Sequence, residues 1–208
     1  MKLEKMLDVL RCPKSGTRLT VDGDILVSEN GSQYPIVNGK PVLVLNIQAL
    51  HTTVPSDSII SKNISEYRPP QFVEDPDAIV VHLGCGDVPS NDPRVMSIDI
   101  LPTRSADIVA EGEALPFATE SIDFVESSAV FEHLYNPILA ASEVRRVLKE
   151  GGRFVVDTAF MQTYHGVPSH YFNMTPQAVE TFIVSDFILE ASKIPKSGTP
   201  LYCTTTRS

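Results

Sequence analysis

A strand–helix–strand pattern in the second half of the chain constrains its fold more than any other feature. The runs "SIDFVESS" (121–128) and "RFVVDT" (153–158) are short, apolar and β-branched, as buried strands are. Between them, "NPILAASEVRRVLKEGG" (136–152) predicts an amphipathic helix with Asn136 as its N-cap, Pro137 at its first position and a glycine pair at its end. Its expected apolar stripe is Ile138, Ala141, Val144 and Val147/Leu148. Strands joined by such a helix imply a right-handed crossover and a parallel sheet.

Further strands are predicted on both sides of this unit. "AIVVHL" (78–83) and "VMSID" (95–99) precede it, and a helix near "TPQAVETFI" (175–183) leads to strands at "FILEA" (187–191) and "LYCTTT" (201–206). We therefore expect an α/β fold, with a Rossmann-like, mostly parallel twisted sheet and helices on both faces.

The first crossover of this sheet is predicted to be shortened. The connection from Gly84 to the next strand at Val95 is brief and contains Pro89 and Pro93. Crossovers between parallel strands usually take ten or more residues, so there is barely room for the usual first helix.

The first 45 residues follow a different pattern. Asp22-Gly23, Asn30-Gly31 and Asn38-Gly39 recur at intervals of eight residues between short β-branched runs, and each pair suits a tight hairpin turn. Residues 1–45 therefore predict a short helix, "LEKMLDVL" (3–10), followed by a β-meander. The Ser- and Pro-rich stretch 46–76 is expected to be a linker, part of which could lie over the following domain, 77–208.

Composition narrows the class of function. The formal charge is −9, and after residue 50 there are 11 basic against 21 acidic residues, which disfavours a nucleic-acid partner. Three widely spaced cysteines argue against a disulfide framework. No apolar run is long enough to span a membrane and the first residues do not form a secretory signal, so we expect a cytoplasmic protein.

Candidate binding residues follow the predicted strands. In open parallel sheets, ligands bind at the carboxyl ends of the strands. "GCGD" follows the first strand, and its Gly84 and Gly86 would let backbone N–H groups approach a ligand. Asp99 ends the second strand, where a carboxylate can accept hydrogen bonds from a ribose diol. "AEGEALPF" (110–117) and "IDFVESSAVFEHL" (122–134) complete the set.

Taken in order, these segments resemble the class I S-adenosylmethionine-dependent methyltransferases, specifically the methyltransferase type 11 family. The resemblance rests on "LGCG", Asp99, "EGEALPF", "SIDFV", "FEHL" and "EVRRVLKEGGRFVV". It implies S-adenosylmethionine as cofactor, with the glycines beside its methionine part, Asp99 on the ribose, the N–H of Gly112 on the adenine and Phe117 as part of the adenine wall. The implied cofactor-binding residues are Gly84, Cys85, Gly86, Asp87, Asp99, Ile100, Glu111, Gly112, Leu115, Ser127 and Ser128.

The chain departs from the family pattern at its glycine loop. His82 stands where an acid is usual, and Val88 stands where a third glycine is usual. The amino-acid end of the cofactor is therefore expected to be held by irregular loop backbone, with weaker binding. Glu126 or Asp87 could supply part of the missing charge.

A loop rich in Tyr and His, residues 159–175, follows the last parallel strand. It resembles a segment of bacterial type 11 methyltransferases found beside glycan genes, which implies a small-molecule or glycan acceptor. A hydroxyl acceptor must lose its proton, and histidine suits that task near neutral pH. The candidate catalytic residues are His165 first, then His133 and His170.

The N-terminal segment resembles the small zinc-ribbon family that activates some tRNA and protein methyltransferases, through "LDVLRCP", "YPI" and "NGKPVLVL". Of that family's four cysteine positions only Cys12 remains, since Ser15, Ser28 and Gly31 occupy the others, so no metal ligands are expected. The segment could instead form a homodimer contact or bind a partner protein. Two alternatives stay open: a cofactor-binding but catalytically silent scaffold, and a protein or tRNA methyltransferase with a built-in activator.

Overall fold

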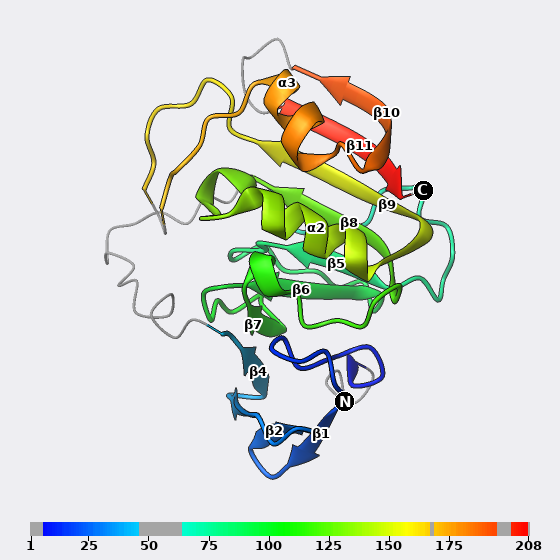
Figure 1. The fold of residues 1–208 in the computed structure, drawn as a ribbon, viewed down its shortest axis with the longest axis vertical. Helices are drawn as coiled ribbons and strands as arrows, with labels where there is room; N and C mark the ends of the chain where they lie inside the picture. Colours follow the sequence, from blue (N-terminus) through cyan, green and yellow to red (C-terminus); the bar gives the residue numbers. More distant parts are fainter. Residues whose placement is uncertain (1–5, 46–63, 167–168, 195–200, 208) are drawn as a thin grey trace.

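The computed structural model describes residues 6–45, 64–166, 169–194 and 201–207. Across these residues the strands form one continuous sheet in the order β1-β2-β3-β4-β7-β6-β5-β8-β9-β11-β10 (Figure 1). The parallel centre comprises β7 (Ile108–Ala110), β6 (Val95–Asp99), β5 (Val80–Leu83), β8 (Ile122–Ser128) and β9 (Leu148–Thr158). At one side β11 (Leu201–Arg207) and β10 (Phe187–Lys193) continue the sheet in antiparallel fashion. The predicted class of fold is confirmed.

The N-terminal region is the expected β-meander. Its strands are β1 (Leu19–Asp22), β2 (Ile25–Ser28), β3 (Gln33–Val37) and β4 (Lys40–Leu43), each antiparallel to the next. The turns at Asn30-Gly31 and Asn38-Gly39 lie where predicted, whereas the first is shifted by one residue to Gly23-Asp24, because Asp22 still pairs with Ile25. Both residues of the Asn38-Gly39 turn have positive φ. Of the predicted first helix, residues 3–5 lie outside the described residues. The chain from Met6 to Leu10 forms a turn in which Leu10 N donates to Met6 O over 2.9 Å.

The meander is joined to the central sheet through β4. This strand lies parallel to β7, with Val42 opposite Val109. Leu10 forms an antiparallel bridge with Phe117, and both side chains are buried in the same hydrophobic core as Leu43. Residues 6–45 therefore share backbone hydrogen bonds and a hydrophobic core with the central sheet.

Helix α2 (Pro137–Val147) begins as predicted. The Asn136 side chain accepts from Leu139 N over 3.1 Å, and Pro137 occupies the first turn. The helix ends at Val147, before the glycine pair, because Leu148 already pairs with Ile122 at the start of β9. The buried residues are Pro137, Ala140, Ala141, Val144 and Val147. The expected stripe is wrong at Ile138, which is 55% exposed, because the helix turns Ala140 toward the core instead.

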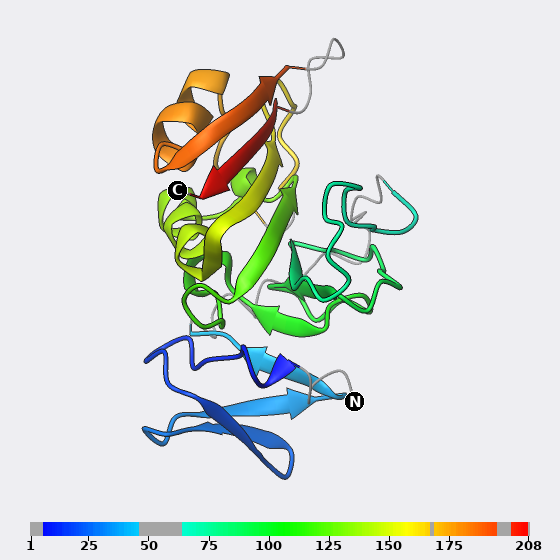
Figure 2. The same cartoon turned by 90° about the vertical axis from the view of Figure 1, so that its right-hand side faces the viewer.

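The two faces of the central sheet are covered differently. Helix α2 and the short helix α3 (Pro176–Ala178), continued by the π-helical turn η4 (Val179–Ile183), lie on one face (Figure 2). In the described residues the other face carries irregular chain, with Tyr67 and Val88 packed on Phe124 and its neighbours. The expected helices on both faces are thus found on one face, because residues 84–94 are too few for a helix and the 64–76 stretch takes its place.

Two composition-based expectations can be compared with the described residues. Cys12, Cys85 and Cys203 are all buried free thiols. None of the helices in the described ranges combines the length and apolar character that a bilayer span requires.

Candidate functional site

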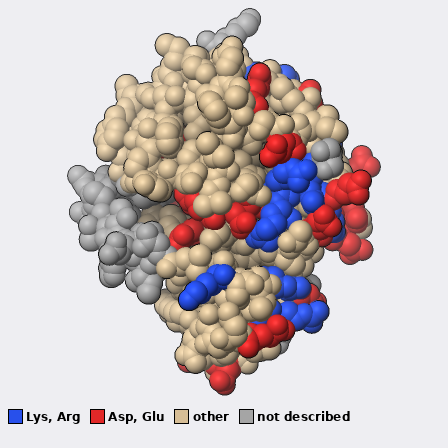
Figure 3. Space-filling model, in the orientation of Figure 1, with Lys and Arg blue, Asp and Glu red and all other residues tan. Residues whose placement is uncertain are grey.

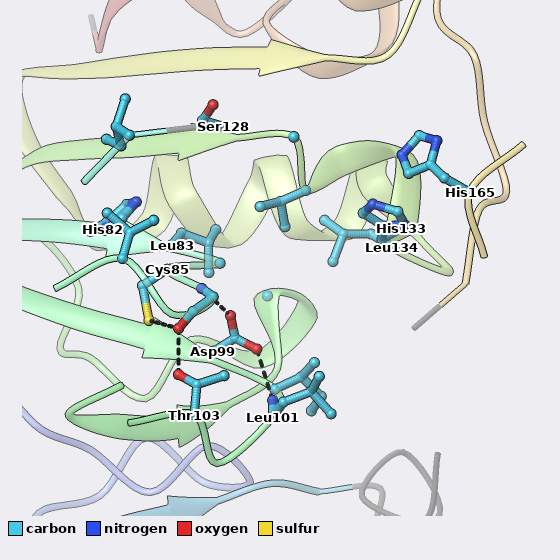
Figure 4. Close-up of a pocket in the computed structure, with 18 of the residues that line it drawn as sticks. His82, Leu83, Cys85, Asp99, Leu101, Thr103, Ser128, His133, Leu134 and His165 are labelled. Atoms are coloured by element: carbon cyan, nitrogen blue, oxygen red, sulfur yellow. Dashed lines mark hydrogen bonds between the residues drawn. The ribbon is translucent and has the colours of Figure 1, made fainter. Parts of the chain in front are cut away.

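A cavity of about 840 Å³ opens at the carboxyl ends of β5, β6 and β8 (Figure 4). Such a volume suits a small-molecule ligand. Its lining residues are Ile64, His82, Leu83, Gly84, Cys85, Gly86, Val88, Asp99, Ile100, Leu101, Thr103, Ala110, Gly112, Ser128, Ala129, Val130, His133, Leu134, Met161, Gln162, Thr163, His165 and Gly166. The strand ends thus meet at one edge of the sheet, as the crevice rule for parallel sheets requires.

Gly84 is required by its conformation and by its neighbour. Its φ is +73°, a region that residues with a Cβ rarely adopt. A Cβ built there would lie 2.1 Å from Cγ2 of Val130, which comes from the loop after β8. The glycine therefore lets the two loops of the cavity wall meet.

The N–H groups of this loop are used within the protein. Gly84 N and Cys85 N both donate to Ile98 O, over 2.8 and 3.0 Å. Gly86 N donates to Oδ2 of Asp99 over 2.7 Å. The expectation that the glycines present these N–H groups to a ligand is wrong, because the tight turn directs them onto β6. The loop offers a ligand its exposed Cα surface instead.

Asp99 links the glycine loop to the segment after β6. Its Oδ1 accepts from Leu101 N over 2.9 Å, while Oδ2 holds Gly86 N (Figure 4). Burial raises the pKa of this carboxyl, and the two N–H groups act in the opposite direction. A carboxylate has about four acceptor sites, so each oxygen keeps capacity for a ligand.

Thr103 reinforces the same turn from the other side. Its hydroxyl donates to Gly86 O and accepts from Ala106 N. The ammonium of Lys40, on β4, donates to Thr103 O over 2.6 Å and to Arg104 O over 3.0 Å. The N-terminal strand region is therefore connected by a charged hydrogen bond to a residue that lines the cavity.

His82 lies at the inner end of the cavity in an apolar setting. Its ring stacks on Tyr67, with 4.0 Å between centroids, and desolvation lowers its pKa to about 4. The Tyr67 hydroxyl donates to Oε2 of Glu126, the residue paired with His82 across β5 and β8. Burial raises the pKa of Glu126 to about 7. Glu126 thus faces Tyr67 and does not supply a free charge to the cavity.

The loop after β8 forms the opposite wall. Ser128, Ala129 and Val130 line the cavity, and Ala129 has a positive φ of 54°. Oδ1 of Asp157 accepts from Ala129 N over 3.2 Å, so the end of β9 fixes this unusual turn. Leu134, at the end of the 3-10 helix η3 (Phe131–His133), packs beside Gly112 of the 3-10 helix η2 (Gly112–Ala114).

A histidine cluster lies at the mouth of the cavity. The rings of His133 and His165 meet edge to face, with centroids 5.0 Å apart. His133 Nδ1 donates to Ser169 O, and His165 Nδ1 donates to Thr163 O over 2.9 Å. Burial lowers the pKa of His133. Figure 4 shows both imidazoles at one end of the cavity, away from His82.

The structure brings most of the predicted residues together, but not all. Seven of the predicted cofactor residues line the cavity: Gly84, Cys85, Gly86, Asp99, Ile100, Gly112 and Ser128. Asp87, Glu111, Leu115 and Ser127 are not among its lining residues, and neither is Phe117. Leu115 and Phe117 are buried in the core, where Glu143 and Arg146 of α2 hold their backbone. Of the three candidate catalytic histidines, His133 and His165 line the cavity, whereas His170 does not.

Several lining residues were missed from the sequence. Leu101 and Thr103 lie within three residues of Ile100, and extending that strand-end segment by one turn includes them. Val130, Leu134 and Met161 lie inside the predicted segments 122–134 and 159–175 but were not assigned to the site. Ile64 carried no comparable signal, because it reaches the cavity from irregular chain.

Comparison with known proteins relates the central part of the chain to methyltransferases. Residues 82–156 match the model of the methyltransferase type 11 family, described as a methyltransferase domain. An uncharacterized methyltransferase of Mycobacterium leprae is 40% identical over 68 residues, which are 31% of this chain and 25% of the relative. An uncharacterized protein of Methanocaldococcus jannaschii is 43% identical over 49 residues, 24% of each chain. This chain thus matches about a quarter of the length of these curated relatives.

Solved structures support the fold. An S-adenosylmethionine-dependent methyltransferase from Methanosarcina mazei superposes with a TM-score of 0.52 at 15% identity, over 68% of this chain and 99% of its own. The [4+2]-cyclase SpnF gives a TM-score of 0.52 at 13% identity, over 65% of this chain and 76% of its own. Residues 82–156 thus match the methyltransferase type 11 family in sequence, and the parallel sheet around them has the fold of S-adenosylmethionine-dependent methyltransferases.

Proposed function

We propose that the protein is an S-adenosylmethionine-dependent methyltransferase that binds its cofactor in the cavity at the ends of β5, β6 and β8. One observation carries the proposal. Gly84 is pressed against Val130, and the Asp99 carboxylate holds the turn between them and β6, so the cavity wall is built around a residue without a side chain. This part of the wall, at Gly84 and Gly86, therefore carries no side chain, and a ligand can lie directly against the backbone of the turn.

The lining residues fit the parts of this cofactor. Asp99 keeps acceptor capacity for the hydroxyls of a ribose. Ile100, Leu101 and Leu134 offer apolar surface for a base near Gly112. When bound, the cofactor supplies an electrophilic methyl group carried on a sulfonium. The contribution of the chain is then to position the acceptor and to exclude water.

The acceptor side is proposed to lie at the mouth of the cavity, beside His133 and His165. Because both Nδ1 atoms donate to backbone carbonyls, both Nε2 atoms carry lone pairs. Such groups can hold a hydroxyl and receive its proton, which suits an oxygen acceptor on a small molecule or glycan. His170 is excluded from this role, because Nδ1 accepts from His165 N and Nε2 donates to Phe172 O.

The surface charge supports a small acceptor over a nucleic acid. On the face that carries α2, Lys and Arg side chains gather beside acidic ones, and the described residues of this face form no continuous basic stripe (Figure 3). The basic residues of the last turn of α2, Arg145 and Arg146, are themselves engaged, the first with Asp186 O and the second with Glu143. With a net charge of −9, the chain lacks the usual electrostatic footprint of a tRNA-binding protein.

Calorimetric titration with S-adenosylmethionine tests the proposal. The wild type should bind one equivalent, and Asp99→Ala should bind at least about tenfold more weakly, since a carboxylate is lost. Asp77→Ala is the matched control, because Asp77 is exposed and lies before β5, at the opposite end of that strand. If no heat is released at millimolar S-adenosylmethionine, the proposed methyltransferase function is wrong. If the cofactor binds but no methyl group is transferred to any hydroxylated acceptor, a catalytically silent scaffold is favoured instead.

A further inference from the structure

The carboxyl group of Glu132 is completely buried, and half of it has no partner in the described part of the chain. Its side chain has 0% exposure. Oε2 accepts the hydroxyl of Thr158 over 2.9 Å, but Oε1 has no hydrogen-bond partner among the described residues. An ionised carboxylate left in this condition is costly, so its charge must be offset by a proton or a cation near Oε1.

The groups that face Oε1 are two imidazole nitrogens. The ligand atoms of Glu132, His133 and His165 all lie within 4.8 Å of one another. Because each Nδ1 donates to a backbone carbonyl, each Nε2 presents a lone pair. One carboxylate oxygen and one nitrogen of each imidazole thus lie close enough together to share one ion.

A proton alone does not fill this point well. A protonated His165 would be an ion-pair partner, yet its Nε2 lies 3.9 Å from Oε1, which exceeds the roughly 2.7–3.2 Å of a hydrogen bond. A metal ion bound at about 2.0–2.2 Å to each atom holds its ligands about 3–4 Å apart. The three ligand atoms, which lie within 4.8 Å of one another, need a shift of roughly 1 Å to reach this spacing, and the side chain of His165, 40% exposed on a loop, has room for it.

From this geometry we propose that Glu132, His133 and His165 form a site for a divalent transition-metal ion, with zinc as the best match. Two imidazoles and one carboxylate suit zinc and its neighbours, whereas Mg²⁺ and Ca²⁺ prefer oxygen ligands alone. The surrounding hydrogen bonds resemble those that orient metal ligands elsewhere: a carbonyl on each Nδ1 and a hydroxyl on the carboxylate. This departs from the expectation, drawn from the lost cysteines, that the chain has no metal ligands.

The position of the site gives it a use. Three protein ligands leave at least one coordination position open, and His133 and His165 line the cavity. On the proposed methyltransferase function, metal binding replaces the direct proton transfer to Nε2: an acceptor hydroxyl bound at the open position loses its proton to solvent more readily, and its oxygen then forms the new bond to the methyl carbon as the carbon–sulfur bond breaks. The metal site itself depends only on the geometry of the three side chains.

Metal titration of the untagged full chain, after removal of adventitious metal with a chelator, tests the site. Zn²⁺ should bind one equivalent by calorimetry, millimolar Mg²⁺ should give no heat, and Co²⁺ should give a visible spectrum without a thiolate charge-transfer band. His165→Gln should weaken Zn²⁺ binding by more than about 100-fold. Thr158→Val, which removes only the hydroxyl on Glu132, should weaken it by about tenfold.

His170→Gln is the matched control, because His170 lies beside His165, with ring centroids 4.2 Å apart, but uses both of its nitrogens on backbone groups. It should retain wild-type affinity for Zn²⁺. Equal loss in the His165 and His170 variants, or no Zn²⁺ binding by the wild type, would overturn the site. Both readouts are made without cofactor or acceptor, so failure of the metal site is distinguishable from failure of the methyltransferase proposal.

Discussion

The ring of Tyr67 lies stacked on the imidazole of His82, and the hydroxyl of the same tyrosine donates to Glu126 over 3.0 Å. One side chain from the irregular segment before β5 thus covers two ionisable groups of the sheet. Burial shifts their pKa values in opposite directions, that of His82 down to about 4 and that of Glu126 up to about 7.

As the pH rises, these two shifts should change the free energy of unfolding in opposite directions. Between about pH 4.5 and 7 the folded protein keeps a proton on Glu126 that the unfolded chain has released, so this group makes stability fall as the pH rises. Between about pH 4 and 6.5 the unfolded chain holds a proton on His82 that the folded protein lacks, so this group makes stability rise. In the wild type the two should largely cancel from about pH 4.5 to 6.5.

Single variants should reveal each contribution. We expect the stability of Glu126→Gln, relative to wild type, to increase by on the order of 2 kcal/mol as the pH rises from 4.5 to 7. We expect His82→Phe, which keeps a ring against Tyr67, to show the opposite trend between pH 4 and 6.5. Urea unfolding across this pH range measures both trends. If the free energy of unfolding changes with pH in the same way in wild type and variants, the pKa shifts of Glu126 and His82 are not the cause.

Gly84→Ala should destabilise the protein through two separate effects. A positive φ costs about 1 kcal/mol for alanine, and contact with Val130 adds roughly 1–3 kcal/mol. Gly151→Ala is the matched control, since Gly151 has nearly the same φ, +74°, with nothing within 4 Å of the added Cβ. The double variant Gly84→Ala/Val130→Ala should regain only the stability lost through contact with Val130, and should keep the loss that comes from the positive φ. Equal losses in the Gly84 and Gly151 variants would show that the contact is relieved without cost.

Lys40→Met should weaken cofactor binding although Lys40 is not among the residues that line the cavity. The substitution removes the donor to Thr103 O and Arg104 O, and so loosens the segment that holds Gly86. We expect a roughly fivefold higher Kd for S-adenosylmethionine, equivalent to about 1 kcal/mol. Lys149→Met serves as control, because its ion pair with Asp123 lies at the start of β9, at the other end of the sheet. The same Kd in both variants would contradict a link through Thr103.

Leu10→Ala should lower the stability of the whole chain by about 2–5 kcal/mol, since a fully buried leucine leaves a cavity. Because Leu10 shares a core with Phe117, unfolding should remain a single transition in differential scanning calorimetry. Val21→Ala is the comparison, since Val21 is 47% exposed on β1 and should change little. Two resolved transitions in the Leu10 variant would show that the first 45 residues unfold on their own.

The sequence predicted the sheet well where local signals were strong. Strand β6 was predicted with its bounds, and α2 was predicted from its cap at Asn136, because a side-chain acceptor before an apolar period is a local property. Strand β7 has only three residues, too few for a period to be read, and its partners on β4 lie 67 positions away, as Val42 does from Val109. Such partners cannot be inferred from one segment.

The site was predicted only in part, because some of its contacts also depend on how distant segments meet. The position of Asp99 at the end of a strand was readable, but its engagement with Gly86 N depends on how tightly the loop turns. The convergence of Glu132, His133 and His165 was not readable either. It arises because Tyr171 N and Phe172 N donate to Glu132 O and so bring a distant loop onto η3.

The pairing of β4 with β7 also bears on solubility. Strand β7 consists of Ile108, Val109 and Ala110, all buried, and without β4 its backbone would form an open apolar edge. Exposed edges of this kind template the addition of strands from other molecules. Detachment of the N-terminal strands is therefore the local opening from which intermolecular aggregation would start. Selection against aggregation is therefore one physical reason to keep these strands paired with β7.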